Sequence, residues 1–374
     1  MRTEARTEAA ESGGAPAGSD MVDWDLAAAA GRRLVPAGPK STPGEVAALV
    51  EELRAAAAAA VEPVASTSRL QAPEGAPAPL VVDRAGWIQA NAASMRAMLG
   101  PVLDTVVERQ RRKGAQRASG GSHRAAGAAT AWGGAVTGTE LAGMLAWVST
   151  KVLGQYDLAP QGDPALLLVA PNVLQAERDL GVDPTDFRQW VCLHEETHRV
   201  QFTAVPWLRG HIIDSARGLG AELAPGPDQA GERIQQVLAN LPGVLRGEID
   251  ITALVATPEQ REELARITAV MSLLEGHADV IMDDVGPSVI PTVAVIRRKF
   301  DNRRKGAGSL DRVLRRLLGM DAKMRQYRDG AAFVRAVVDQ VGREEFNTVW
   351  TSPETLPRAE EIVEPGRWVQ RVLG

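Results

Sequence analysis

Two histidines stand four residues apart in the segment WVCLHEETHRVQF, residues 190–202, and a glutamate directly follows the first. Side chains four positions apart on an α-helix share one face, so His194 and His198 can bind one zinc ion at about 2 Å. Glu195 lies about 100° further around the helix and can reach a zinc-bound water without becoming a ligand. The spacing therefore indicates a metallohydrolase in which Glu195 acts as the general base.

The alternative is a packed helix that carries two histidines without any metal. The chain has only five histidines, so a match at this spacing is rare by composition alone. A helix is also expected around the motif, because Asp183 or Thr185 can cap its start and Pro206 follows its end. The residues therefore favour a metal site.

A catalytic zinc needs a third protein ligand and one open coordination position. The segment LLEGHAD supplies two candidates, Glu275 and His277. Glu275 can bind the metal while Asp279, one turn further, accepts the free ring N–H of a ligand histidine. His277 points about 200° away from Glu275 on a regular helix, and it becomes the ligand only if the helix breaks at Gly276. We therefore prefer Glu275, and His277 can otherwise donate a hydrogen bond to a reaction intermediate or simply pack.

A histidine as third ligand in the metzincin arrangement is excluded. That pattern needs glycine at position 201 and histidine at position 204, where the chain has Gln201 and Ala204. Metal hydrolases commonly stabilise the developing oxyanion with tyrosine, histidine or arginine. In the segment KMRQYRDG, Tyr327 is a candidate for this role, whereas Lys323 and Arg325 are more simply interpreted as surface charge.

The elements that must position these residues are predicted to be helices. The chain is rich in alanine and leucine and poor in aromatic residues, a composition that favours a mainly α fold with a small β element. Helices are predicted to start near Thr42, to extend from about residue 83 to 110, and to cover residues 137–156. A capping box at Thr257 predicts one continuous helix through LLEGHAD. The one convincing strand is ALLLVAPNV, residues 165–173.

The remaining composition limits the class of protein. A formal net charge of -5 argues against a nucleic-acid binder, although arginine clusters leave that alternative to be tested by salt dependence. Cys192 is the only cysteine, so the chain cannot form an internal disulfide, and we expect a buried structural role. We see no signal peptide or apolar membrane span, and predict a cytoplasmic protein without a membrane partner. Residues 111–134 are predicted to form a long loop.

The two motifs together, His-Glu-x-x-His on one helix and Glu-x-x-x-Asp on another, resemble the gluzincin class of zinc metallopeptidases. More narrowly, several segments resemble an actinobacterial family of zincin-like hydrolases, some of whose members are named for association with deazaflavin-coenzyme biosynthesis. These segments are VDWDLA, APNVLQAERDLGVDPTDFRQWVCLHEETHRVQFTAVPWL, LLEGHADVIMD, RRKGAGSLDRVLRRLLGMDAKMRQYRDGAAFV and VWTSPETLP. The resemblance extends from about Val22 to the C-terminus.

This resemblance implies a zincin-like metalloprotease fold with an active-site helix and a second helix that bears the third ligand. Residues 1–21 would be a flexible tail and residues 22–374 a single domain. The resemblance assigns zinc to His194, His198 and Glu275, and makes Glu195 the catalytic glutamate. The separation between His198 and Glu275 is far longer than in typical gluzincins and predicts extra helices around the cleft.

In zincins an edge strand beside the active-site helix pairs with an extended peptide substrate, and ALLLVAP is the segment that we expect to do so. An ordinary buried strand is the alternative. The sequence thus predicts a zinc-dependent hydrolase, a peptidase or amidase. A catalytically silent binding or scaffold protein is the alternative, against which an intact Glu195 argues. The sequence leaves the substrate and the oligomeric state open.

Overall fold

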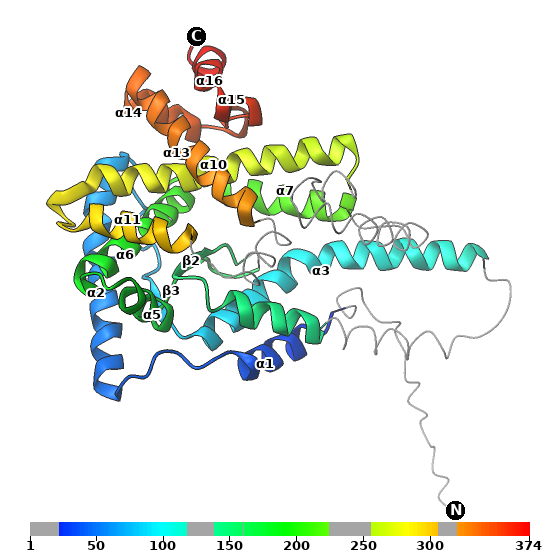
Figure 1. Ribbon diagram of the computed structural model, residues 1–374. Coiled ribbons are helices and arrows are strands. Elements are labelled where there is room, and N and C mark those ends of the chain that lie inside the picture. Colours follow the sequence, from blue (N-terminus) through cyan, green and yellow to red (C-terminus); the bar gives the residue numbers. More distant parts are fainter. Residues whose placement is uncertain (1–21, 118–137, 160, 224–255, 306–319) are drawn as a thin grey trace, which may run out of the picture.

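The computed structural model describes residues 22–117, 138–159, 161–223, 256–305 and 320–374. In this part of the chain, helices surround a small three-stranded sheet (Figure 1), and the predicted fold class is confirmed. The predicted tail at residues 1–21 lies outside the described residues. Residues 111–117, predicted to begin a long loop, instead continue the preceding helix to Arg117, because arginine, lysine and glutamine are good helix formers. The rest of the predicted loop, to residue 134, lies outside the described residues. None of the described helices is long and apolar enough to cross a membrane.

The longer helices supply most of the structure. They are α2 (Pro43–Ser68), α3 (Arg84–Arg117), α6 (Pro184–Ala204), α10 (Pro258–Val285) and α13 (Met320–Val341). The shorter ones are α1 (Trp24–Leu34), a helix at residues 138–148, α5 (Ala170–Leu180), α7 (Leu208–Leu223), α11 (Val293–Lys305), α14 (Arg343–Phe346), α15 (Ala359–Val363) and α16 (Pro365–Val372). Short 3-10 helices are η2 (Gly286–Ser288), η3 (Asn347–Trp350) and η4 (Pro353–Thr355).

Side-chain caps begin the two helices that carry the motifs. The Asp183 carboxylate accepts a hydrogen bond of 3.0 Å from the backbone N–H of Asp186 at the start of α6. At the start of α10, Thr257 and Gln260 form the predicted capping box, with bonds of 2.9 and 3.3 Å. Each cap satisfies backbone donors that have no partner within the helix. The prediction of one continuous helix through LLEGHAD is confirmed.

The sheet has the strand order β1-β3-β2. Strand β3 (Ala165–Val169) pairs in parallel with β1 (Leu80–Val82) and antiparallel with β2 (Gly154–Asp157). Both edges of β3 therefore pair with another strand, and the prediction that ALLLVAP is an edge strand is wrong. Within the described part of the chain, β2 is the edge strand that lies beside α6.

Strand β2 also corrects a predicted helix. The helical pattern predicts a helix over residues 137–156, but the helix ends at residue 148 and a turn leads into β2. Two hydrogen bonds of 2.6 Å hold this turn, because the buried Asn172 side-chain N–H₂ donates to the carbonyl oxygens of Ser149 and Val152. Arg84 donates to the Asn172 oxygen at 2.6 Å and fixes the amide in place. A single buried asparagine thus positions the chain that enters the edge strand.

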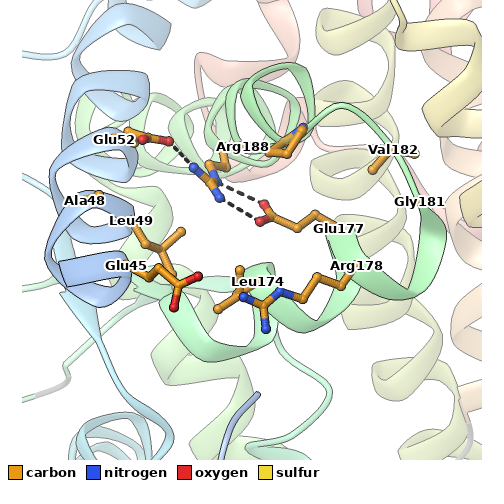
Figure 2. A pocket seen from close by; sticks show the side chains of 11 residues that line it. Glu45, Ala48, Leu49, Glu52, Leu174, Glu177, Arg178, Gly181, Val182 and Arg188 are labelled. Carbon is orange, nitrogen blue, oxygen red and sulfur yellow. Dashed lines mark hydrogen bonds and ion pairs between the residues drawn. The ribbon is translucent and has the colours of Figure 1, made fainter. Parts of the chain in front are cut away.

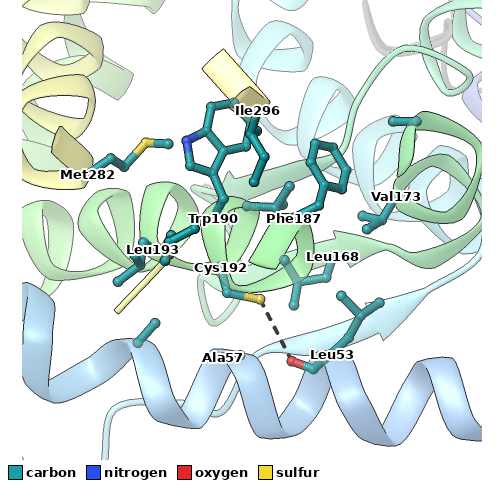
Figure 3. Close-up of a cluster of buried hydrophobic side chains, with 14 of the residues drawn as sticks. Leu53, Ala57, Leu168, Val173, Phe187, Trp190, Cys192, Leu193, Met282 and Ile296 are labelled. Atoms are coloured by element: carbon teal, nitrogen blue, oxygen red, sulfur yellow. Dashed lines mark hydrogen bonds between the residues drawn. The ribbon is translucent and has the colours of Figure 1, made fainter. Parts of the chain in front are cut away.

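Three hydrophobic clusters stabilise these elements. The largest lies between α2, α5, α6, α10 and α11, and Figure 3 shows Trp190 and Phe187 inside it. Cys192 faces α2, with Sγ 3.8 Å from the carbonyl oxygen of Leu53 (Figure 3). Burial raises the pKa of the Cys192 thiol to about 12, so the predicted buried structural role is supported. The other clusters join α10 and α13 to the C-terminal helices, and α1 and α3 to the sheet.

Helices α10 and α13 cross with their backbones in contact (Figure 1). Two glycines make this possible, because a Cβ atom at Gly276 would overlap the backbone of Gly330, and one at Gly330 would overlap the carbonyl oxygen of Ser272. The helix does not break at Gly276, contrary to the alternative considered for His277. The close contact at this crossing instead determines where α10 lies relative to α13, and with it the position of Glu275.

Candidate metal centre

Helices α6 and α10 bring two imidazoles and one carboxylate together. The Nε2 atoms of His194 and His198 are 3.2 Å apart. Glu275 Oε2 lies 3.5 Å from Nε2 of His194 and 3.4 Å from Nε2 of His198. One ligand atom from each of the three residues lies within 4.8 Å of the others. The predicted ligands thus converge from two helices that are far apart in the sequence.

The donor atoms fit a divalent cation. The Nε2 atoms of the two imidazoles face each other across 3.2 Å. Their two lone pairs can point at each other only if a proton or a cation lies between them. Glu275 Oε2 is buried and makes no hydrogen bond within the described part of the chain. Two histidine nitrogens and one glutamate oxygen form the donor set of a catalytic zinc site. The His194 side chain is 22 % exposed, which leaves a side of the cluster open to solvent.

Charges in the cluster shift the pKa values of His198 and Glu275. Burial alone would lower the pKa of His198, but the negative charge of Glu275, 3.4 Å away, outweighs burial and raises it to about 9. Burial would likewise raise the pKa of Glu275, yet the charge of His198 and the contact with His194 hold it well below its usual range. Without metal, the carboxylate therefore holds a proton on His198.

Zinc binding is expected to displace this proton. Since the pKa of His198 is about 9, the imidazolium is populated at pH 7, and Nε2 must lose its proton before it can bind metal. Zinc affinity should therefore rise with pH up to about pH 9, by as much as about tenfold per unit, and about one proton should be released per zinc at pH 7. Calorimetric titration in buffers with different ionisation enthalpies measures this proton. Binding that is independent of pH between 6 and 9 would contradict the assignment.

Glu195 lies between α6 and the edge strand β2. Its side chain is buried, with 6 % exposure. A Cβ atom at Gly154 would lie 2.5 Å from Glu195 Cδ and 2.7 Å from Oε1, so the carboxylate packs directly on the strand backbone. Only glycine leaves room for it there. The predicted general base is thus held one helical step from the metal ligands, and Gly154 is a determinant that the sequence reasoning missed.

The Nδ1 atoms of the two histidines, which point away from the other ligand atoms, contact side chains other than Asp279. His194 Nδ1 lies 3.1 Å from the sulfur of Met282, and His198 Nδ1 lies 3.0 Å from Oε1 of Gln201. Asp279 is predicted to accept one of these ring N–H groups, but its carboxylate instead faces Arg297 at 3.6 Å. The prediction for Asp279 is therefore corrected. One turn beyond Glu275, its side chain faces α11, where a cation attracts it.

His277 is fully buried and turned away from the metal ligands. Its ring packs against Phe346 and Trp350, at centroid distances of 5.8 and 5.3 Å, and its Nδ1 lies 2.9 Å from Nε2 of Gln201. Burial lowers its pKa to about 3, so the ring is neutral at physiological pH. With 0 % exposure it cannot contact a substrate, and as α10 is continuous it cannot replace Glu275. His277 as metal ligand and His277 as donor to a reaction intermediate are therefore both corrected, and the remaining alternative, a packed histidine, is the one observed.

The predicted oxyanion stabiliser falls outside what can be described. Tyr327 lies on α13, as do Lys323 and Arg325, but their side chains are not among those that the structure describes. Two contacts of the histidines escaped the sequence reasoning, namely Met282 and Gln201. Gln201 carries a signal in the sequence, because it lies three residues after His198 on the same helix face.

A separate cavity of about 430 Å³ lies between α2, α5 and the start of α6 (Figure 2). Arg188 crosses it, with hydrogen bonds of 2.6 and 2.9 Å to Glu177 and a further ion pair to Glu52. These charges satisfy one another, and the cavity shares no lining residue with the metal centre. It offers no unpaired group for catalysis among its described residues.

Comparisons with known proteins agree with this geometry. Residues 22–369 match the model of the zincin-like metallopeptidase family. The crystal structure of a candidate hydrolase with a novel fold from Chloroflexus aurantiacus is similar to the chain, with 28 % sequence identity and a TM-score of 0.62. The match covers 94 % of this chain and 98 % of that one. No curated protein matches the sequence. The chain therefore belongs to the zincin-like metallopeptidase family.

Proposed function

We propose that the protein is a zinc-dependent hydrolase that cleaves a peptide or amide bond, with Glu195 as general base. The single observation that carries the proposal is the approach of Glu275 Oε2 to within 3.5 Å of both imidazole Nε2 atoms, without a hydrogen bond of its own. A buried carboxylate in that position, with two nitrogens facing it, is arranged for a shared cation. Family membership supports the same chemistry.

His194, His198 and Glu275 would hold the metal. When bound, zinc supplies Lewis acidity, which polarises a carbonyl group and lowers the pKa of water toward roughly 7. Glu195 would accept the proton of the attacking water and later pass it to the leaving amine. Its confinement against Gly154 restricts the carboxylate to the side of the centre that faces the edge strand.

The edge strand supports a peptide as the substrate class. Among the described strands β2 has one side without a pairing strand, and it runs directly past Glu195. An extended peptide that added to this side would place a backbone carbonyl near the general base. On the opposite face of β2, the side-chain oxygen of Gln155 accepts a hydrogen bond of 2.8 Å from the indole N–H of Trp87. This bond holds β2 against α3.

Metal removal tests the proposal. The zinc-loaded protein should cleave members of a broad library of peptides and simple amides. Dialysis against a chelator should abolish cleavage, and about one equivalent of zinc per chain should restore it. A protein that binds zinc but leaves the whole library intact would favour the scaffold alternative, and a protein that binds no zinc would overturn the proposal.

A substitution at Gly154 tests whether β2 positions Glu195. Gly154→Ala should leave zinc affinity unchanged, because the three atoms nearest to the added Cβ all belong to Glu195 and none to a ligand residue. It should lower turnover by about 10²-fold, the effect of a shift near 1 Å. The measurements are kcat/KM and zinc content. Gly143→Ala is the control, since a Cβ atom there meets nothing within 4 Å. Equal turnover in the two variants would contradict the role of the strand.

Some predictions from the sequence stay predictions. They are the cytoplasmic location, the link to deazaflavin-coenzyme biosynthesis, and the absence of nucleic-acid and membrane partners. The fold and the metal centre bear on none of them.

A further inference from the structure

The side-chain amide of Gln201 is buried behind the metal centre. Gln201 lies on α6 with 0 % exposure. Its Oε1 is 3.0 Å from His198 Nδ1, and its Nε2 is 2.9 Å from both the carbonyl oxygen of Leu274 and His277 Nδ1. Every polar atom of the amide therefore has a partner, and two of the three partners come from α10, the helix that carries Glu275.

The Leu274 carbonyl fixes which way the amide points. A carbonyl oxygen can only accept a hydrogen bond, so the atom that faces it must be the N–H₂ group of Gln201. This removes the usual ambiguity between the oxygen and nitrogen of an amide. Gln201 Oε1 is then the atom that faces His198, and it can only accept. The second N–H of Gln201 donates to His277, which accepts through Nδ1.

The amide in turn determines the tautomer of His198. Since Gln201 Oε1 can only accept, the contact of 3.0 Å requires a proton on His198 Nδ1. The lone pair of the neutral ring is then on Nε2, the atom that faces His194 and Glu275. A ring with its proton on Nε2 would set the lone pair of Nδ1 against the lone pairs of the amide oxygen, and Nε2 would have no lone pair for a metal.

We propose that Gln201 is a positioning residue, whose amide, oriented by the Leu274 carbonyl and His277, holds His198 in the tautomer that binds metal. The inference rests on the proposed function only in requiring that the centre binds zinc. It assigns to Gln201 the role that the sequence had given to Asp279. It also gives the buried His277 a role, as the neutral acceptor that completes the amide's hydrogen bonds.

Zinc affinity of matched variants tests the inference. Gln201→Leu removes the acceptor at nearly constant volume, and should weaken zinc binding by about 10–100-fold in competition with a chromophoric chelator. Gln201→Glu keeps an oxygen toward His198 and, when protonated, a donor toward Leu274, so it should restore most of the affinity. The control is Gln189→Leu on the same helix, where the amide nitrogen has no hydrogen-bond partner among the described residues. It should bind zinc like the unmodified protein.

A direct reading of the tautomer needs no variant. In the zinc-loaded protein with ¹⁵N-labelled histidine, long-range ¹H–¹⁵N correlation should show His198 with zinc on Nε2 and a proton on Nδ1. A metal-bound Nδ1 in His198 would overturn the inference. This result decides the matter even if Gln201→Leu fails to fold, which circular dichroism of the metal-free protein would reveal.

The outcomes separate this inference from the proposed function. If the unmodified protein binds no zinc, the proposed function fails and the positioning role with it. If it binds zinc and Gln201→Leu binds zinc equally well, only the positioning role of Gln201 fails. If Gln201→Leu loses affinity and Gln201→Glu does not regain it, the amide is merely structural and the inference is overturned.

Discussion

Replacing Glu195 with glutamine is expected to leave zinc bound and to lower turnover by roughly 10²–10⁴-fold, the usual contribution of a general base. Glutamine preserves the shape that packs against Gly154 but cannot accept a proton. Glu195 also lies outside the group of ligand atoms formed by His194, His198 and Glu275. The measurements are zinc content and single-turnover cleavage of whichever library peptide the unmodified protein cleaves.

The exposed Glu51 provides a matched control for this experiment. Its side chain is 71 % exposed on α2 and pairs only with Arg54 in the described structure, so Glu51→Gln should cleave at the normal rate. If Glu195→Gln retained zinc and full turnover, Glu195 would not be the base. A loss of zinc in this variant would also contradict the geometry, because the carboxylate would then be acting as a ligand.

Replacing Gly330 with alanine is expected to destabilise the fold by roughly 3 kcal/mol, the upper range of overpacking effects. The added Cβ atom would overlap the carbonyl oxygen of Ser272, a backbone atom that cannot rotate away as a side chain could. Helices α10 and α13 would have to separate. Because α10 carries Glu275, zinc binding should weaken together with stability. Urea denaturation of the metal-free protein measures the first effect, and chelator competition the second.

Gly366→Ala is the control for this crossing, since a Cβ atom at Gly366 meets nothing within 4 Å. Its stability and zinc affinity should stay within about 0.5 kcal/mol of the unmodified values, as for ordinary surface substitutions. An unchanged unfolding free energy in Gly330→Ala would show that α10 and α13 can accommodate the added methyl group without moving apart. The backbone contact could then not be what positions Glu275.

The two histidines of the candidate metal centre could be predicted because helical geometry places them on one face locally. His194 and His198 are four residues apart, and the caps at Asp183 and Thr257 define the two helices that carry the ligands. The position of Glu275 beside the histidines depends on how α10 packs against α6, which the spacing of residues along the chain does not determine. Its prediction depended on the resemblance and on the need for a third ligand.

The edge strand could not be predicted from hydrophobic patterning. Strand β2 is short and includes a glycine and an aspartate, both of which are depleted in strands. It directly follows a helix and a turn whose apolar residues continue the helical pattern. The apolar segment ALLLV gave a strong strand signal because it is buried in the middle of the sheet, which is also the reason that it cannot be the edge.

The surroundings of the histidines depended on how the two helices are rotated against each other. Asp279 shares a helix face with Glu275, but α11 brings Arg297 to it. Gln201 shares a face with His198, and the α10 backbone happens to offer it a carbonyl oxygen at Leu274. Spacing identifies both as candidates, and only the packing of α6 against α10 decides between them.

Anomalous diffraction at the zinc absorption edge, from crystals grown with one equivalent of zinc, would show whether His194, His198 and Glu275 share one metal ion. One peak is expected, at about 2 Å from Nε2 of His194, Nε2 of His198 and the carboxylate of Glu275. A peak elsewhere in the molecule, or a zinc ion at the two histidines with the Glu275 carboxylate out of reach, would contradict this shared site.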